Sequence, residues 1–378
     1  MSENTLSDVL DPRTLALRHR IGLVALALLG TAPLWVPLLY AGGQGLLHLR
    51  TLTAAMFFGM FAMSWDAVSG YTGQISFGHS LFFTVGGYGS ALLNLGWGVP
   101  PVLAVVLATL LAAAVGVLVG VPALRLEGPY LSLVTLVAPL ILLQVFVVYS
   151  DVFGGELGIS NPAPLVETGS FAQETTAFFY VAFGLFVAIL VVLLAVTRSD
   201  AGAVFTAIRE DEQAVAAAGL NPAKFKIFAF VLSAAVGGVA GAVFVHTIGK
   251  PSPSQLLVLT VSTEVIIASV VGGMGTITGA AVGGMFLSVF RSWLSNVTAT
   301  VPGLGLAVGK LDLVIFAVGT LALLFYLPGG LVRWGVVRGR ALLSTDEAAA
   351  TDGGRTPPEQ VAASWRDAID RLRGGDGE

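Results

Sequence analysis

Long apolar runs separated by short polar segments dominate the chain. Ten runs are present, at about residues 21–40, 52–69, 81–95, 102–121, 130–149, 177–196, 227–248, 256–271, 277–290 and 313–327. A helix needs about 20 apolar residues to cross a bilayer, and most of these runs approach that length. The pattern predicts an all-α, polytopic membrane protein with about ten transmembrane segments, or eight if two short runs are re-entrant.

Composition supports lipid as the main solvent. Charged residues make up 11% of the 378 residues, against roughly 25% in an ordinary soluble domain, and the mean hydropathy is +0.86. The formal net charge is −4 and the basic residues form no stripe, which argues against nucleic-acid binding. Cysteine is absent, so disulfides, thiolate metal sites and cysteine nucleophiles are excluded.

The charges between the runs predict the topology. Residues 150–176 contain four acids and no Lys or Arg, whereas residues 197–226 contain Arg198, Arg209, Lys224 and Lys226. The positive-inside rule places the first segment outside and the second in the cytoplasm. Both termini are predicted to be cytoplasmic. Arg50, Arg291 and Lys310 are exceptions, predicted to lie on outer loops.

Three regions follow from this reading. Residues 1–20 form a polar cytoplasmic arm, residues 21–335 a transmembrane domain, and residues 336–378 a largely disordered cytoplasmic tail. The tail is rich in Gly, Pro and charge. Its segment 364–373 has the apolar spacing of a short amphipathic helix, with a functionless tail as the alternative.

Two Gly-rich segments interrupt the apolar pattern about two hundred residues apart. Non-helical backbone at membrane depth is tolerated only where protein buries it or a cavity hydrates it, and paired breaks indicate a transport pathway between repeats. Close helix packing through glycine is the alternative. The predicted pathway residues of the two breaks are Asp66, Gly70, Gly73, Gln74, Ser76, Gly78, His79, Gly272, Gly273, Gly275 and Thr276.

Two acids fall within or beside apolar runs, and a carboxylate at the bilayer centre costs on the order of 3 kcal/mol on insertion scales. Asp66 lies beside the first break, where a structural hydrogen bond is expected. Glu264 lies near the middle of run 256–271 with no Lys or Arg within a helical turn. Pathway lining and a helix-packing bond are both open for Glu264, which completes the set of predicted pathway residues.

The cytoplasmic segment 197–226 is long for a simple connection. Ser199 and Asp200 offer a helix cap, Gly219 a helix end, and Asn221 with Pro222 a second start. One or two short helices are expected, forming a docking surface for another protein rather than a solvated hairpin. The predicted docking residues are Arg209, Glu210, Asp211, Glu212, Ala217, Gly219, Asn221 and Pro222.

Catalytic chemistry is not indicated. Gly249-Lys250 and Gly309-Lys310 lack the rest of a phosphate loop, and the four histidines have no metal-ligand spacing. The chain is therefore predicted to be no enzyme, with no cofactor and no metal.

Several motifs resemble one family. The segments GYTGQISFGH (70–79), EGPYLSLVTL (127–136), AIREDE to GLNP (207–222), 228–241, VVGGMGT (270–276) and LPGGL (327–331) are similar, in order, to the LivM-type permease subunit of branched-chain amino-acid ABC importers. The resemblance covers about residues 50–335.

The resemblance implies a permease in the plasma membrane of a prokaryote that works with other subunits. These are a second, LivH-like permease or another copy of the chain, two cytoplasmic ABC ATPases and an extracytoplasmic substrate-binding protein. It also implies that residues 206–222 dock on an ATPase, and that branched-chain amino acids are carried. Urea and short-chain amide importers use a similar subunit, so they stay an alternative. An ion-coupled secondary transporter relying on Asp66 and Glu264, and a membrane-embedded enzyme, are rivals from other classes.

Overall fold

The computed structural model describes residues 17–40, 43–123, 129–159, 162–249, 252–297, 311–326 and 330–332. In these ranges the protein is helical and contains no strand, so the all-α prediction is confirmed. The predicted N-terminal arm lies almost wholly outside the described residues, and the C-terminal tail lies wholly outside them.

The helices follow the apolar runs. The first half contains α2 (Leu17–Gly30), α3 (Ala32–Leu39), α4 (Gln44–Trp65), the π-helix η1 (Asp66–Gly70), α5 (His79–Trp97), α6 (Pro101–Ala123), α7 (Pro129–Val148), α8 (Ser150–Phe153) and the 3-10 helix η2 (Gly155–Leu157). The second half contains α9 (Phe171–Thr197), α10 (Asp200–Glu210), α11 (Glu212–Ala217), α12 (Pro222–Thr247), α13 (Pro253–Leu256), α14 (Leu259–Gly273), α15 (Ile277–Ser295) and α16 (Asp312–Tyr326).

Fewer helices than expected are suited to crossing a membrane. Among the described residues, six helices are long and apolar enough, and α2 with α3, bent by 63°, would make a seventh. The predicted count of ten is not confirmed. Run 81–95 lies in α5, outside these six, and run 256–271 corresponds to the shorter apolar helix α14. The six spans are Gln44–Gly70, Pro101–Pro122, Tyr130–Val148, Phe171–Thr197, Pro222–Thr247 and Ile277–Ser295.

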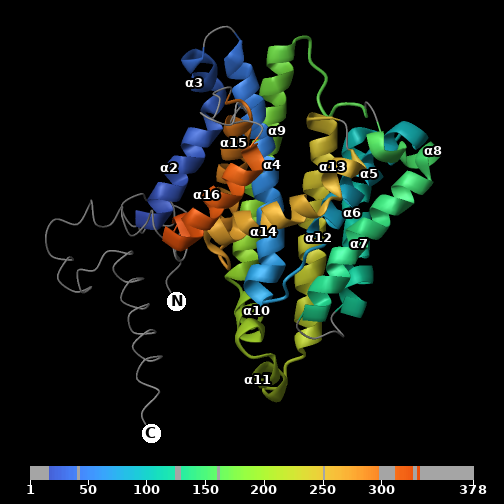
Figure 1. Cartoon of the computed structure of the whole chain (residues 1–378), viewed down its shortest axis with the longest axis vertical. Helices are drawn as coiled ribbons and strands as arrows, with labels where there is room; N and C mark the ends of the chain where they lie inside the picture. The colour runs from blue at the N-terminus through green and yellow to red at the C-terminus, as the bar shows by residue number, and fades with distance from the viewer. Residues whose placement is uncertain are drawn as a thin grey trace, which may run out of the picture.

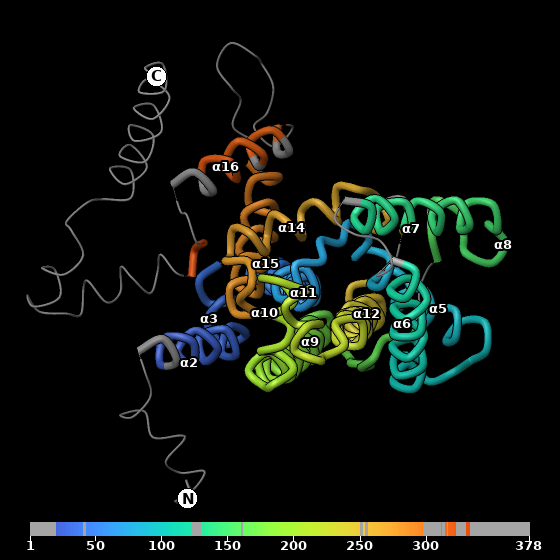
Figure 2. Tube along the Cα trace, turned by 90° about the horizontal axis from the view of Figure 1, so that it is seen from below, coloured from blue at the N-terminus to red at the C-terminus, as the bar shows by residue number. Residues whose placement is uncertain are grey.

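Two spans form the centre of the molecule. In the most apolar stretch of each span, 56% is buried for α4 with η1 and 61% for α12, against 22% for α7. Viewed from the end that carries α11, α12 lies between α5 to α7 on one flank and α14 to α16 on the other, with α9 along one edge (Figure 2). The exposed apolar side chains of α6 and α7 are suited to lipid or a partner subunit.

Glycine allows α5 and α12 to approach closely. A Cβ added to Gly86 would overlap the backbone carbonyl of Gly238, and one on Gly241 would overlap that of Phe83. Small residues at such contacts are typical of helix pairs in membranes, because dispersion forces between closely packed backbones replace the hydrophobic effect.

The two segments that differ in charge lie at opposite ends of the bundle. The chain between α8 and α9 is at one end, and α10 with α11 is at the other (Figure 1). This separation is what the charge pattern of segments 150–176 and 197–226 requires.

Candidate functional site

The first break follows α4 and is closed by its own hydrogen bonds. After η1 and a further turn the chain leaves the helical conformation at residues 73–78. The hydroxyl of Ser69 donates to the carbonyl oxygen of Gln74 at 2.9 Å and accepts from the backbone N–H of Ser76 at 3.2 Å. The indole N–H of Trp65 donates to the carbonyl oxygen of Ser76 at 2.7 Å. Backbone groups freed by the break are thus satisfied within the protein, as membrane depth demands.

The second break separates α14 from α15. Gly273 and Gly275 have φ of 125° and 78°, which side chains with a Cβ rarely adopt. The hydroxyl of Thr276 donates to the carbonyl oxygen of Gly273 at 2.6 Å. A Cβ on Gly272 would overlap the carbonyl oxygen of Gly279, so this glycine also serves close packing.

The two breaks meet. A carboxylate oxygen of Asp66, a fully buried residue, accepts the backbone N–H of Gly275 at 2.7 Å across 209 positions of sequence. A Cβ on Gly70 would lie 2.7 Å from the backbone nitrogen of Gly275. Asp66 therefore makes the structural hydrogen bond expected of it, but to the other break. Its second carboxylate oxygen has no hydrogen-bond partner among the described residues.

The segment that contains α10 and α11 reaches this meeting point. Arg209 of α10 donates from its Nη1 to the carbonyl oxygen of Gly70 at 2.9 Å and pairs with the Glu210 carboxylate at 2.9 Å. Its side chain also lies against Gly73 and Gly275. We call Asp66, Gly70, Gly73, Arg209 and Gly275 the break junction. It joins predicted pathway residues to a predicted docking residue.

Other predicted docking residues shape α10, α11 and the start of α12. The Asp211 carboxylate accepts the backbone N–H of Ala214 at 3.0 Å and starts α11. Asn221 caps α12 by accepting from Lys224, with Pro222 in the first turn. Gly219, at φ 83°, lies in the turn between α11 and α12. The segment therefore forms two short helices, α10 and α11.

Part of the α10–α11 segment is exposed, and another part is attached to α12. Glu210, Glu212 and Ala217 are exposed. Glu212 forms an ion pair with Lys226, whose side chain is only 7% exposed. Because this ion pair joins α11 to α12 and Val215 of α11 is buried, the segment is attached to α12 while other residues of it are exposed.

His79 lies between helices. Its Nε2 is 2.9 Å from the Ser64 hydroxyl and 2.7 Å from the Ser233 hydroxyl, and the ring is fully buried. Gly78 packs against the backbone of Thr135. These two predicted pathway residues, with buried Ser76, hold α4, α5, α7 and α12 together. Gln74 is partly exposed.

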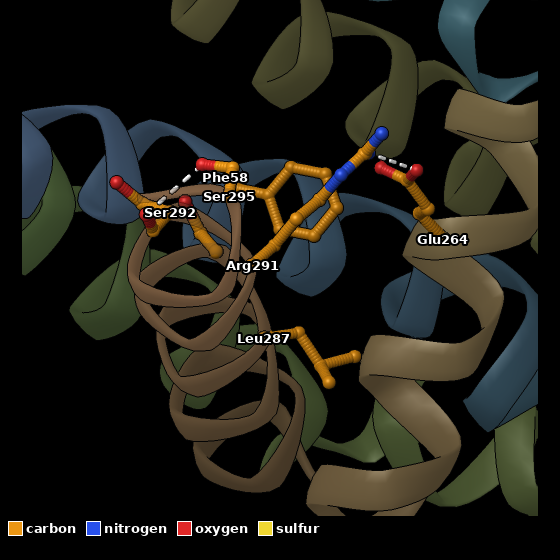
Figure 3. Close-up of a pocket in the computed structure, with 7 residues that line it drawn as sticks. Phe58, Glu264, Leu287, Arg291, Ser292 and Ser295 are labelled. Carbon is orange, nitrogen blue, oxygen red and sulfur yellow. Dashed lines mark hydrogen bonds and ion pairs between the residues drawn. The ribbon is translucent and has the colours of Figure 1, made fainter. Parts of the chain in front are cut away.

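Glu264 lies apart from the break junction and has a charged partner. Arg291 extends from α15 across Phe58 to form an ion pair with the Glu264 carboxylate of α14 (Figure 3). Arg291 was expected on an outer loop, but it belongs to α15. Sequence reasoning missed this pair because the partner lies 27 positions away. A positive charge at the end of an apolar run, opposite an unexplained acid, was the available signal.

Two cavities meet at this ion pair. The first, of about 360 Å³, is lined by Glu264 and Arg291 and by Ser288, Ser292 and Ser295 of α15. The second, of about 260 Å³, also reaches Glu264 and is walled by five phenylalanines of α4, α5 and α12. A polar chamber and an aromatic chamber thus share one charged boundary, which can bind a ligand with both charged and apolar groups.

Comparison with known proteins gives consistent matches. The family described as "Branched-chain amino acid transport system / permease component" matches residues 47–324. The chain is 32% identical to the high-affinity branched-chain amino acid transport system permease protein LivM of Escherichia coli, over 74% of this chain and 69% of that protein. LivM of Salmonella typhimurium is also 32% identical, over 72% of this chain and 68% of that protein. A probable LivH of Methanocaldococcus jannaschii is 27% identical, over 66% of this chain and 81% of that protein.

Proposed function

The chain belongs to the branched-chain amino acid transport permease family, and from that premise we propose that it carries branched-chain amino acids across the membrane as one subunit of an ABC importer. The match over residues 47–324 supports this function most strongly. The relatives named above favour it over a urea or amide importer and over an ion-coupled transporter.

The proposed assembly contains a second permease, two cytoplasmic ABC ATPases and an extracytoplasmic binding protein. A LivH-like subunit is the favoured second permease, since a LivH protein is among the relatives, and a second copy of the chain is the alternative. In this proposal α10 and α11 dock on an ATPase. Their exposed surface around Ala217 and Glu210 supports this, because small and charged groups there allow close approach.

The break junction would carry the motion of the ATPases into the membrane. Movement of α10 displaces Arg209, which is hydrogen-bonded to Gly70, and Gly70 packs against Gly275. Since both breaks are non-helical, they can absorb changes of backbone dihedral angles that a continuous helix cannot. The helices α4, α5, α14 and α15 would then reorient together around the pathway.

One experiment tests this function. The chain is co-expressed with its genomic neighbours, purified through a tag, and reconstituted in vesicles. We expect ATPase subunits to co-purify and leucine to accumulate on ATP addition. Ala217→Arg should prevent ATPase co-purification without loss of the folded chain, because a bulky charge on the docking surface opposes contact. Thr168→Arg, an equal change on an exposed residue at the opposite end, is the control.

Two results would contradict the proposal. Urea uptake without leucine uptake would change the substrate. Leucine uptake by the lone chain along an ion gradient would remove the ATPases from the mechanism.

A further inference from the structure

The ion pair of Glu264 and Arg291 is unusual in its position. It joins two helices, α14 and α15, at the boundary of the polar and aromatic cavities. The side chain of Glu264 is 12% exposed and that of Arg291 is 42% exposed. Ionisable groups within transmembrane segments are costly and mark functional sites by default.

We propose that an aliphatic α-amino acid binds here during translocation, with its carboxylate on Arg291, its ammonium group on Glu264 and its side chain in the aromatic cavity. This inference rests on the proposed function. It names the residues that would recognise the substrate within the permease itself. The planar guanidinium is well suited to a carboxylate, because it can donate two parallel hydrogen bonds.

The charges of the site complement a zwitterion as a unit. An α-amino acid carries one positive and one negative group on adjacent atoms, and the site offers one of each sign within contact distance. When the ligand is absent, Glu264 and Arg291 neutralise each other. When it binds, two new ion pairs replace one, so neither side chain is left as an uncompensated charge. An uncharged amide such as urea would gain neither ion pair.

The aromatic cavity selects the side chain. Its walls include Phe57, Phe58 and Phe61 of α4, Phe83 of α5 and Phe244 of α12, with Val261 beside Glu264 on α14. An apolar cavity of roughly 150 Å³ accommodates benzene, so about 260 Å³ has room for a branched four-carbon side chain. A charged side chain would be desolvated there, with only the hydroxyls of Ser80 and Ser288 beside Glu264 as polar groups of the wall.

The polar cavity provides the approach. Ser288, Ser292 and Ser295 lie at helical spacing with Arg291 on one face of α15, and Figure 3 shows Ser292, Ser295 and Arg291 on this helix. Hydroxyl groups can donate and accept hydrogen bonds, so a ligand can take the place of water at these serines. Because the ligand must also displace an existing ion pair, binding is expected to be weak, which favours release on the other side.

Three variants test the site in vesicles that contain the complete assembly with saturating binding protein. These are Glu264→Gln, Arg291→Gln and the double variant that combines them. We expect initial leucine uptake to fall at least tenfold in each, while the ATPase subunits still co-purify with each variant. Asp151→Asn, which neutralises an exposed acid on α8, should leave uptake unchanged.

The double variant separates recognition from structure. Each single variant leaves one charge without its partner, so either could fail through misfolding. The double variant has two neutral amides that can hydrogen-bond to each other, and it should assemble normally with its partners. A structural ion pair predicts that uptake returns in the double variant, and that return would overturn the proposal.

A further variant tests the role of the guanidinium. Arg291→Lys keeps the charge but not the planar fork, so it should retain more leucine uptake than Arg291→Gln. Equal uptake in the wild type and all variants would place recognition elsewhere in the permease. If the wild-type assembly itself takes up no leucine, the proposed function fails and this site fails with it.

Discussion

Arg209 has the most consequential single hydrogen bond in the break junction, because it alone among the described contacts donates from α10 to the first break. A hydrogen bond to a charged group contributes about 1.5–3 kcal/mol, and 1.4 kcal/mol is about a tenfold change in an equilibrium. Arg209→Ala should therefore lower substrate-stimulated ATP hydrolysis about tenfold while ATPase subunits still co-purify. ATPase assays on the reconstituted assembly measure this.

Two controls accompany that variant. Arg198→Ala removes an exposed arginine at the same end of the molecule, and Glu210→Gln removes the ion pair of Arg209 without removing its bond to Gly70. Both should keep most of the stimulation. An equal loss in Arg209→Ala and Arg198→Ala would mean that positive charge at this end matters, rather than contact with the break.

Sequence reasoning at this scale identified residues but not their partners. Asp66 was expected to make a structural hydrogen bond beside its own break. It makes a structural hydrogen bond, but its partner is Gly275 of the other break. Glu264 was correctly singled out as an acid in an apolar run, while Arg291 was assigned to a loop. Both errors have one cause, because pairing between distant helices depends on tertiary packing, which local spacing does not encode.

At the scale of elements, the α5–α12 contact depends on glycine. Gly86→Ala would place a methyl group on the carbonyl of Gly238, and overpacking of a close contact costs about 1–3 kcal/mol. We expect lower thermal stability of the purified chain. Gly96→Ala lies in the same helix with nothing within 4 Å of the added carbon, so it should be neutral or stabilising by up to about 1 kcal/mol.

The comparison of these two variants tests the contact directly. If both destabilise equally, the effect belongs to the helix backbone, and α5 and α12 do not depend on close approach at Gly86. Fluorescence-monitored unfolding in one detergent keeps the solvent constant between them.

Apolar runs predicted the presence of helices better than their role in the membrane. Runs 130–149, 177–196 and 227–248 correspond to spans, but α5 and α14 are not among the six helices suited to crossing. A helix enclosed by others can be as apolar as one that faces lipid, since both avoid water. The predicted count of ten spans is therefore not confirmed among the described residues. Residues 199–222 were better defined by caps, although Asp211 divides them into two helices.

At the scale of the whole molecule, we predict that the end with α10 and α11 faces the cytoplasm. The acidic segment and the α10–α11 segment lie at opposite ends (Figure 1), and the positive-inside rule places α10–α11 in the cytoplasm. The chain contains no cysteine, so a single introduced thiol reports its own location. Thr168→Cys and Ala217→Cys provide exposed positions at the two ends.

We expect a membrane-impermeant maleimide to label Thr168→Cys in intact cells and to label Ala217→Cys only after the membrane is opened. The wild-type chain is the blank for both. Labelling of Ala217→Cys in intact cells would place α10 and α11 outside, where no ATPase could dock, and the break junction would then have to couple to the external binding protein. Labelling of Ala217→Cys only in opened membranes would place α10 in the cytoplasm. Among the described contacts, α10 would then be the element through which a cytoplasmic ATPase could act on Gly70 and Gly275.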